Sequence, residues 1–104
     1  MSGVNSPYRY QYENVAASQT NQVMGGTGAA GDYIYRLVCV VSTALTAQVQ
    51  IKDGSGTAFT VLPNSPSGGI GTYVLELNMV SRVGAWQVST GAGVEVVAVG
   101  VFSA

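Results

Sequence analysis

Apolar and polar residues alternate most regularly in the last third of the chain, residues 71–104. Large apolar side chains occupy every second position of residues 73–77, and the same two-residue period returns in residues 86–89. This is the period of a β-strand with one buried face. A turn-forming TGAG segment then leads into a long final strand, residues 94–102. This third of the chain predicts a β-meander with one large aromatic residue, Trp86, to pack.

The final predicted strand is apolar on both faces. One face carries Val94, Val96, Ala98 and Phe102, and the other carries Glu95, Val97, Val99 and Val101. An antiparallel strand in a small two-layer domain normally keeps one face in water. Val97, Val99 and Val101 therefore predict a surface that is covered, either by the rest of the domain or by another subunit.

The remaining apolar runs also predict strands. They are residues 32–42, 47–53 and 59–62, separated by the turn-forming segments DGSG and PNSPSGG. No segment of ten or more residues has the 3.6-residue period of a helix. We therefore predict an all-β fold with six or seven short strands. It forms a small β-sandwich that is jelly-roll-like, with an immunoglobulin-like arrangement as the alternative.

An extended N-terminal arm, residues 1–14, is predicted to precede a sandwich domain of residues 15–104. Tyr8, Tyr10 and Tyr12 alternate with polar residues, so an extended arm carries three phenol rings on one side. The arm is interpreted either as a frayed terminus or as a segment that lays aromatic anchors on a neighbouring protein.

The composition is that of a protein whose surface is covered in an assembly. Only nine of 104 side chains are charged, and the formal net charge is −1, so little repulsion keeps copies apart. Without a basic patch, no nucleic-acid partner is expected. No stretch is long and apolar enough to span a bilayer, and the N-terminus lacks the pattern of a signal peptide. We expect no membrane partner, and synthesis and residence in a cytosol.

Catalytic chemistry is not expected. The chain contains no histidine and only five carboxylates, which no motif brings together, so we predict no catalytic residue, no metal site and no cofactor. The single cysteine, Cys39, lies in an apolar strand and is interpreted as a small buried residue. Trp86 is interpreted as a core anchor, and stacking on a sugar is the alternative role of its ring.

Three segments resemble a family of small glycine-rich β proteins from tailed bacteriophages: VAASQTNQVMGGTGAAGDYIYRLV, VQIKDGSGTAFTVLP and GAWQVSTGAGVEVVAVGVF. The resemblance covers residues 15–104 and leaves out the tyrosine-rich arm. It implies a structural virion protein on the capsid exterior, assembled in the host cytoplasm. The implied role is that of a capsid decoration, or cement, protein that clamps neighbouring copies of the major capsid protein.

Two functional hypotheses follow. In the first, the chain is a capsid decoration protein that forms a homo-oligomer, with a trimer favoured over a dimer. The final strand or residues 32–42 then supply the subunit contact, while the tyrosines of the arm reach the major capsid protein. In the second, it is a receptor- or glycan-binding module of a phage tail or head fibre. That module would use Trp86, Tyr73 or loop residues such as Asn64 and Ser65.

Overall fold

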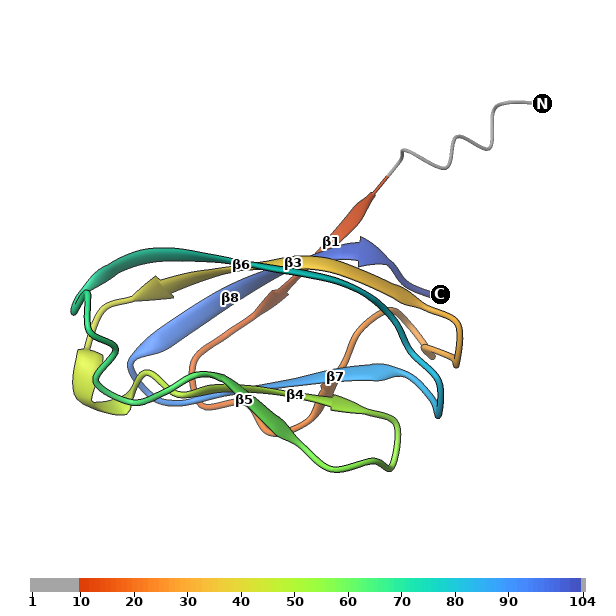
Figure 1. The fold of residues 1–104 in the computed structure, drawn as a ribbon, viewed down its shortest axis with the longest axis horizontal. Helices are drawn as coiled ribbons and strands as arrows, with labels where there is room; N and C mark the ends of the chain where they lie inside the picture. Colours follow the sequence, from red (N-terminus) through yellow and green to blue (C-terminus); the bar gives the residue numbers. More distant parts are fainter. Residues whose placement is uncertain (1–9, 104) are drawn as a thin grey trace.

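The chain folds into two antiparallel four-stranded sheets that face each other, as seen in a computed structural model that describes residues 10–103 (Figure 1). Sheet A has the order β1 (Gln11–Val15), β8 (Val94–Val101), β3 (Tyr33–Val41) and β6 (Gly71–Val80). Sheet B has the order β2 (Gln22–Val23), β7 (Trp86–Thr90), β4 (Val49–Asp53) and β5 (Phe59–Leu62). A single 3₁₀ turn, η1 (Ala44–Thr46), joins β3 to β4. The predicted all-β sandwich is confirmed, with eight strands among the described residues rather than six or seven.

The strands pair in a nested order, with the first and last strands outermost and the two middle strands innermost. β1 pairs with β8, β2 with β7, β3 with β6 and β4 with β5. The β-meander predicted for residues 71–104 is wrong, because β6 and β8 belong to sheet A while β7 belongs to sheet B. The alternation correctly indicated which residues point inward. These strands, however, pack face to face across the core instead of edge to edge.

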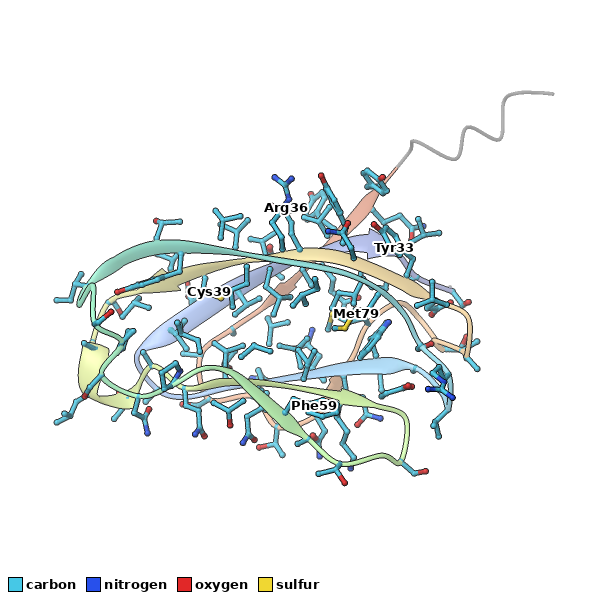
Figure 2. All side chains as sticks on the ribbon, in the orientation of Figure 1. Tyr33, Arg36, Cys39, Phe59 and Met79 are labelled. Carbon is cyan, nitrogen blue, oxygen red and sulfur yellow. The ribbon has the colours of Figure 1, made fainter. Side chains whose placement is uncertain are left out.

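The core lies between the two sheets and draws on the inner faces of both. Its fully buried residues include Ile34, Leu37, Cys39 and Val96 from sheet A and Val49, Ile51 and Val88 from sheet B. Figure 2 shows Cys39 and Met79 pointing into this space. No helix among the described residues has the length and apolar character to cross a membrane.

Trp86 occupies the core at the start of β7. Its side chain is 3% exposed, and its indole Nε1 donates a 3.0 Å hydrogen bond to the carbonyl oxygen of Asp32. The buried Asp32 carboxylate accepts hydrogen bonds from Ala29 N and from both the backbone N and the hydroxyl of Ser103. Trp86 and Asp32 together tie sheet B to the start of β3 and to the segment after β8.

Residues 11–14, which the sequence assigned to the arm, are part of the sandwich. Gln11–Asn14 belong to β1, which pairs with β8 from Gln11 opposite Gly100 to Val15 opposite Val96. The last four residues of the predicted arm thus form a strand of sheet A. Tyr10 and Tyr12 are described by the structure, whereas Tyr8 lies outside the described residues.

Candidate interaction surface

The outer side of sheet A carries a continuous layer of valines and tyrosines, called here the Val/Tyr face. Its members are Tyr10, Tyr12, Tyr33, Tyr35, Val38, Val40, Val74, Val80, Val97, Val99 and Val101. The residues that alternate with them along β3 and β8 are buried and point to the opposite side of the sheet, into the core. The Val/Tyr face is therefore a second apolar layer, on the side of the sheet that faces away from the core.

Strand register brings these side chains into rows across sheet A. One row joins Val97 of β8, Val38 of β3 and Val74 of β6, and a second joins Val101, Tyr33 and Val80. Val74 is 53% exposed and Val80 is 56% exposed. Directly opposed side chains in such rows lie close enough to contact one another. The two apolar rows lie on either side of a row formed by Glu76, Arg36 and Val99, and exposed apolar surfaces of this kind mark sites of interaction.

Three tyrosine rings gather at one end of this face. The rings of Tyr10 and Tyr35 stack with centroids 4.9 Å apart, and Tyr33 lies 6.2 Å from each of them. A bulge in β3 makes the cluster possible, because the pairing register shifts between Ile34 and Arg36. This extra residue places the side chains of Tyr35 and Arg36 on the same side of the sheet.

The two charged residues at the centre of the Val/Tyr face, Arg36 and Glu76, interact within the face itself. Arg36 Nε lies 3.1 Å from Glu76 Oε2 in an ion pair, and Arg36 Nη2 donates to the Tyr35 hydroxyl at 2.8 Å. The guanidinium carbon of Arg36 also lies 4.4 Å from the centre of the Tyr35 ring. Figure 2 shows Arg36 on the outer side of sheet A. With its two central charges neutralised by each other, the face suits an apolar partner.

The Tyr33 hydroxyl stays neutral and serves as a donor. Desolvation raises the pKa of Tyr33, and the nearby oxygens of Tyr10, Tyr35 and Glu76 raise it further. The hydroxyl donates a 2.7 Å hydrogen bond to Asn78 Oδ1 on β6. Tyr33 therefore adds no charge to the face at neutral pH.

The structure brings most of the predicted interface residues together. Tyr12 lies opposite Val99 in the β1–β8 pairing, and Val97 and Val101 belong to the same face. From the sequence, residues 32–42, which contain the four β3 members of the face, were expected only as an alternative subunit contact, and no interface role was expected for Val74 and Val80. For the four residues on β3, a signal was present: residues 33–41 are apolar at nearly every position, so this strand also has two apolar faces.

The outer side of sheet B is polar. It carries Gln50 and Lys52 on β4 and Gln87 and Ser89 on β7, which lie opposite each other in register. A shallow cavity of about 430 Å³ follows these strands and is lined by amide and hydroxyl side chains together with Lys52. This surface is typical of a strand face that stays in water.

A wider opening lies between the two sheets along the edge strands β5 and β6. It measures about 680 Å³ and is lined by Phe59, Met79, Val80, Val83 and Trp86 among others. Phe59 is 57% exposed because it sits on an edge strand at the mouth of this opening. The sandwich is therefore less completely closed on the β5–β6 side.

Asp53 organises the loop beside this opening. Its carboxylate accepts hydrogen bonds from the backbone N–H groups of Arg82, Val83 and Gly84 at 2.8–3.2 Å. Burial raises the pKa of Asp53, but the three hydrogen bonds and the Arg82 charge outweigh it and hold the pKa below its ordinary value. The predicted turn at residues 53–56 is present, with Gly56 N donating to Asp53 O at 2.8 Å. Asp53 thus holds the β4–β5 turn against the β6–β7 connection.

Two of the reactive side chains, Cys39 and Glu13, contribute to the fold. Cys39 is fully buried, and burial raises the pKa of its thiol to about 12. Glu13 accepts hydrogen bonds from Gly25 N and Gln22 Nε2 and so fixes the connection between β1 and β2. Within residues 10–103, no three side chains of the metal-binding types lie together.

Comparisons with protein-family models, with curated proteins and with solved structures each found no match to this chain.

Proposed function

We propose that this chain is a structural virion protein, a capsid decoration protein that binds the outside of a tailed-phage head and clamps neighbouring major capsid protein subunits. Its location is then the capsid exterior. The choice of partner rests on the resemblance to tailed-phage virion proteins. The choice of surface rests on one observation, the exposed Val/Tyr face, which a fold of this size does not need for its own core.

The proposed mode of action is burial of the Val/Tyr face against capsid protein. Fully burying a valine or a larger apolar side chain contributes about 1.5–3 kcal/mol. Tyrosines add contact area at a low entropic cost because each has only two side-chain torsions. The N-terminal arm would extend this contact, since Tyr10 and Tyr12 already lie at the β1 edge of the face. Several copies on one lattice would multiply the affinity of each through effective concentration.

We also assign the sandwich to the jelly-roll class in preference to the immunoglobulin-like class. The support is the nested pairing of eight strands, first with last and second with seventh. A jelly roll has eight strands in two Greek keys, whereas immunoglobulin constant-type domains place seven strands in sheets of four and three.

The test is co-pelleting of the purified protein with undecorated tailed-phage capsids, with its mass in solution measured by light scattering. We expect an oligomer that pellets at a fixed stoichiometry. Val101→Glu should weaken binding at least tenfold, because it buries an unpaired carboxylate in the contact. Gln50→Glu on the outer side of sheet B is the matched control and should bind as the unchanged protein does. A monomer that stays in the supernatant would contradict the proposal.

The alternative, a receptor- or glycan-binding module of a phage fibre, has fewer groups to use than the sequence indicated. Trp86 lies in the core. The Tyr73 hydroxyl donates a hydrogen bond to Gly69 O, and Asn64 Oδ1 accepts a hydrogen bond from Gln48 N. Glycan-array binding by the folded protein, lost in Tyr12→Ala and kept in Gln50→Glu, would favour this alternative.

A further inference from the structure

β6 is an unprotected sheet edge. It is the longest strand among the described residues, ten residues from Gly71 to Val80, and it lies at the end of sheet A. Proteins usually blunt such edges with short strands, bulges, proline or lysine. The other three edges follow this rule: β2 has two residues, β5 has four and a register shift, and β1 is short and carries Glu13. β6 contains neither proline nor lysine, its one charged residue, Glu76, is paired with Arg36, and its register shift is confined to residues 76–79.

The side chains of β6 are also incompletely covered. Its inward-facing residues, Tyr73, Leu75, Leu77 and Met79, pack against the core but stay half-buried. On its outer side Val74 and Val80 are more than half exposed. A strand added at this edge would cover apolar groups on both faces and would also satisfy backbone N–H and C=O groups.

The regular part of β6 has a definite midpoint. The register against β3 shifts between Glu76 and Met79, and Asn78 takes a left-handed conformation with φ 50°. The register is unbroken from Gly71 to Glu76, and Leu77 is the last residue before the left-handed Asn78, so the stretch available for pairing is residues 71–77, with Val74 at its centre. A segment that pairs with a copy of itself in the antiparallel sense is self-complementary about one central residue.

We propose that β6 pairs antiparallel with β6 of a second copy of this chain, with Val74 on the two-fold axis. In this register Val74 faces Val74, and Glu76 faces Thr72 of the other copy. An axis at Glu76 would place two carboxylates directly opposite each other, which is destabilising. An axis at Leu75 would extend the pairing into the distorted region at Asn78. An axis at Val74 avoids both faults and also pairs the whole of residues 71–77, which an axis nearer Gly71 would not.

The pairing joins two copies of sheet A into one eight-stranded sheet with a doubled Val/Tyr face on one side. Open sheets of this width are common. The inference rests on the proposed function for the homo-oligomer, and it names the partner and the surface of self-association. It makes that oligomer a dimer, in place of the trimer favoured from the sequence.

Cross-linking through a single introduced thiol tests the register. Val74→Cys should form a disulfide-linked dimer on mild oxidation, since directly opposed residues have Cβ atoms about 4.5–5.5 Å apart. Val80→Cys is the matched control: it is equally exposed, on the same strand and the same face. In the proposed pairing the two copies of residue 80 are about 40 Å apart. Cys39 is buried, with its pKa raised to about 12, so it should not react. Equal cross-linking of both variants, or of neither, would overturn the proposal.

Light scattering without capsids gives an independent test. The unchanged protein should be a dimer. Val74→Glu should raise the dimer Kd at least tenfold, because it brings two carboxylates together on the axis. Val101→Glu, which places the same charge on the central strand β8, should leave the dimer intact. A dimer that does not bind capsids would contradict the decoration function alone. A monomer that binds them would contradict the β6 pairing alone.

Discussion

The two sheets of this sandwich have the same kind of inner face and opposite kinds of outer face. Val94, Val96 and Ala98 on β8 fill the core as Val49 and Ile51 on β4 do. Outside, sheet B presents amides, hydroxyls and a lysine, whereas sheet A presents valines and tyrosines. Folding needs only the inner faces, because one layer of apolar side chains per sheet makes the core.

The difference between the two outer faces shows that the pattern of apolar and polar residues carries two signals. One signal specifies the fold, and the other marks an apolar surface that folding does not require. Where polar and apolar residues alternate strictly, as in residues 86–90, the pattern reports the fold and nothing more. Where alternation fails and both faces are apolar, as in β3 and β8, the extra apolar layer is unexplained by folding. It is this departure that indicates a surface built for a partner.

The largest effect is expected from removing the core residue on which both sheets depend. Trp86→Ala should lower the free energy of unfolding by about 3–5 kcal/mol, because it leaves a cavity and an unpaired Asp32 carbonyl. Chemical denaturation followed by circular dichroism measures it. Both sheets should unfold together in one cooperative transition. An unchanged midpoint would mean that the indole contributes little to the core.

A smaller loss is expected at the connection between the sheets. Asp53→Ala should cost about 1–2 kcal/mol at neutral pH, since three backbone N–H groups lose their acceptor. Because folding lowers the pKa of Asp53, its contribution is complete above the ordinary carboxyl range and is lost as the pH falls through the lowered value. The gap between the two proteins should therefore shrink toward about pH 2. A gap that stays constant with pH would exclude the carboxylate as its cause.

The smallest effect distinguishes two tyrosines within the Val/Tyr face. Tyr10→Ala should cost about 0.5–1.5 kcal/mol, because Tyr10 stacks on Tyr35. Tyr12 is 72% exposed, so Tyr12→Ala should change the free energy of unfolding by less than about 0.5 kcal/mol. Thermal melting of both variants measures the difference. Equal losses would show that stacking is not what holds Tyr10.

Much of the fold could be predicted because its determinants are local. The two-residue period placed Leu75, Trp86, Val88 and Val96 on inward faces, and the structure puts all four in or against the core. β1 was predicted only as part of an extended arm, and residues 22–24 only as turns or an irregular strand. β1 carries mostly polar side chains, and β2 has only two residues, so both owe their structure to pairing with β8 and β7.

The candidate surface was predictable only in part, because it is assembled from residues far apart in sequence. Val97, Val99 and Val101 were found from one strand alone. The ring cluster of Tyr10, Tyr33 and Tyr35 needs the pairing of β1, β8 and β3 as well as the bulge in β3. Neither strand order nor a bulge leaves a periodic signal in the sequence.

The nested pairing also determines when, during synthesis, sheet A can be completed. β8 is the last strand described, yet it lies between β1 and β3 in sheet A. A ribosome adding about 5–20 residues per second makes β3 several seconds before β8. Until β8 emerges, β1 and β3 have no strand between them, so sheet A cannot close. Folding of this domain is therefore completed after translation of β8. It should be slow, because the pairings that complete the sheet join distant parts of the chain.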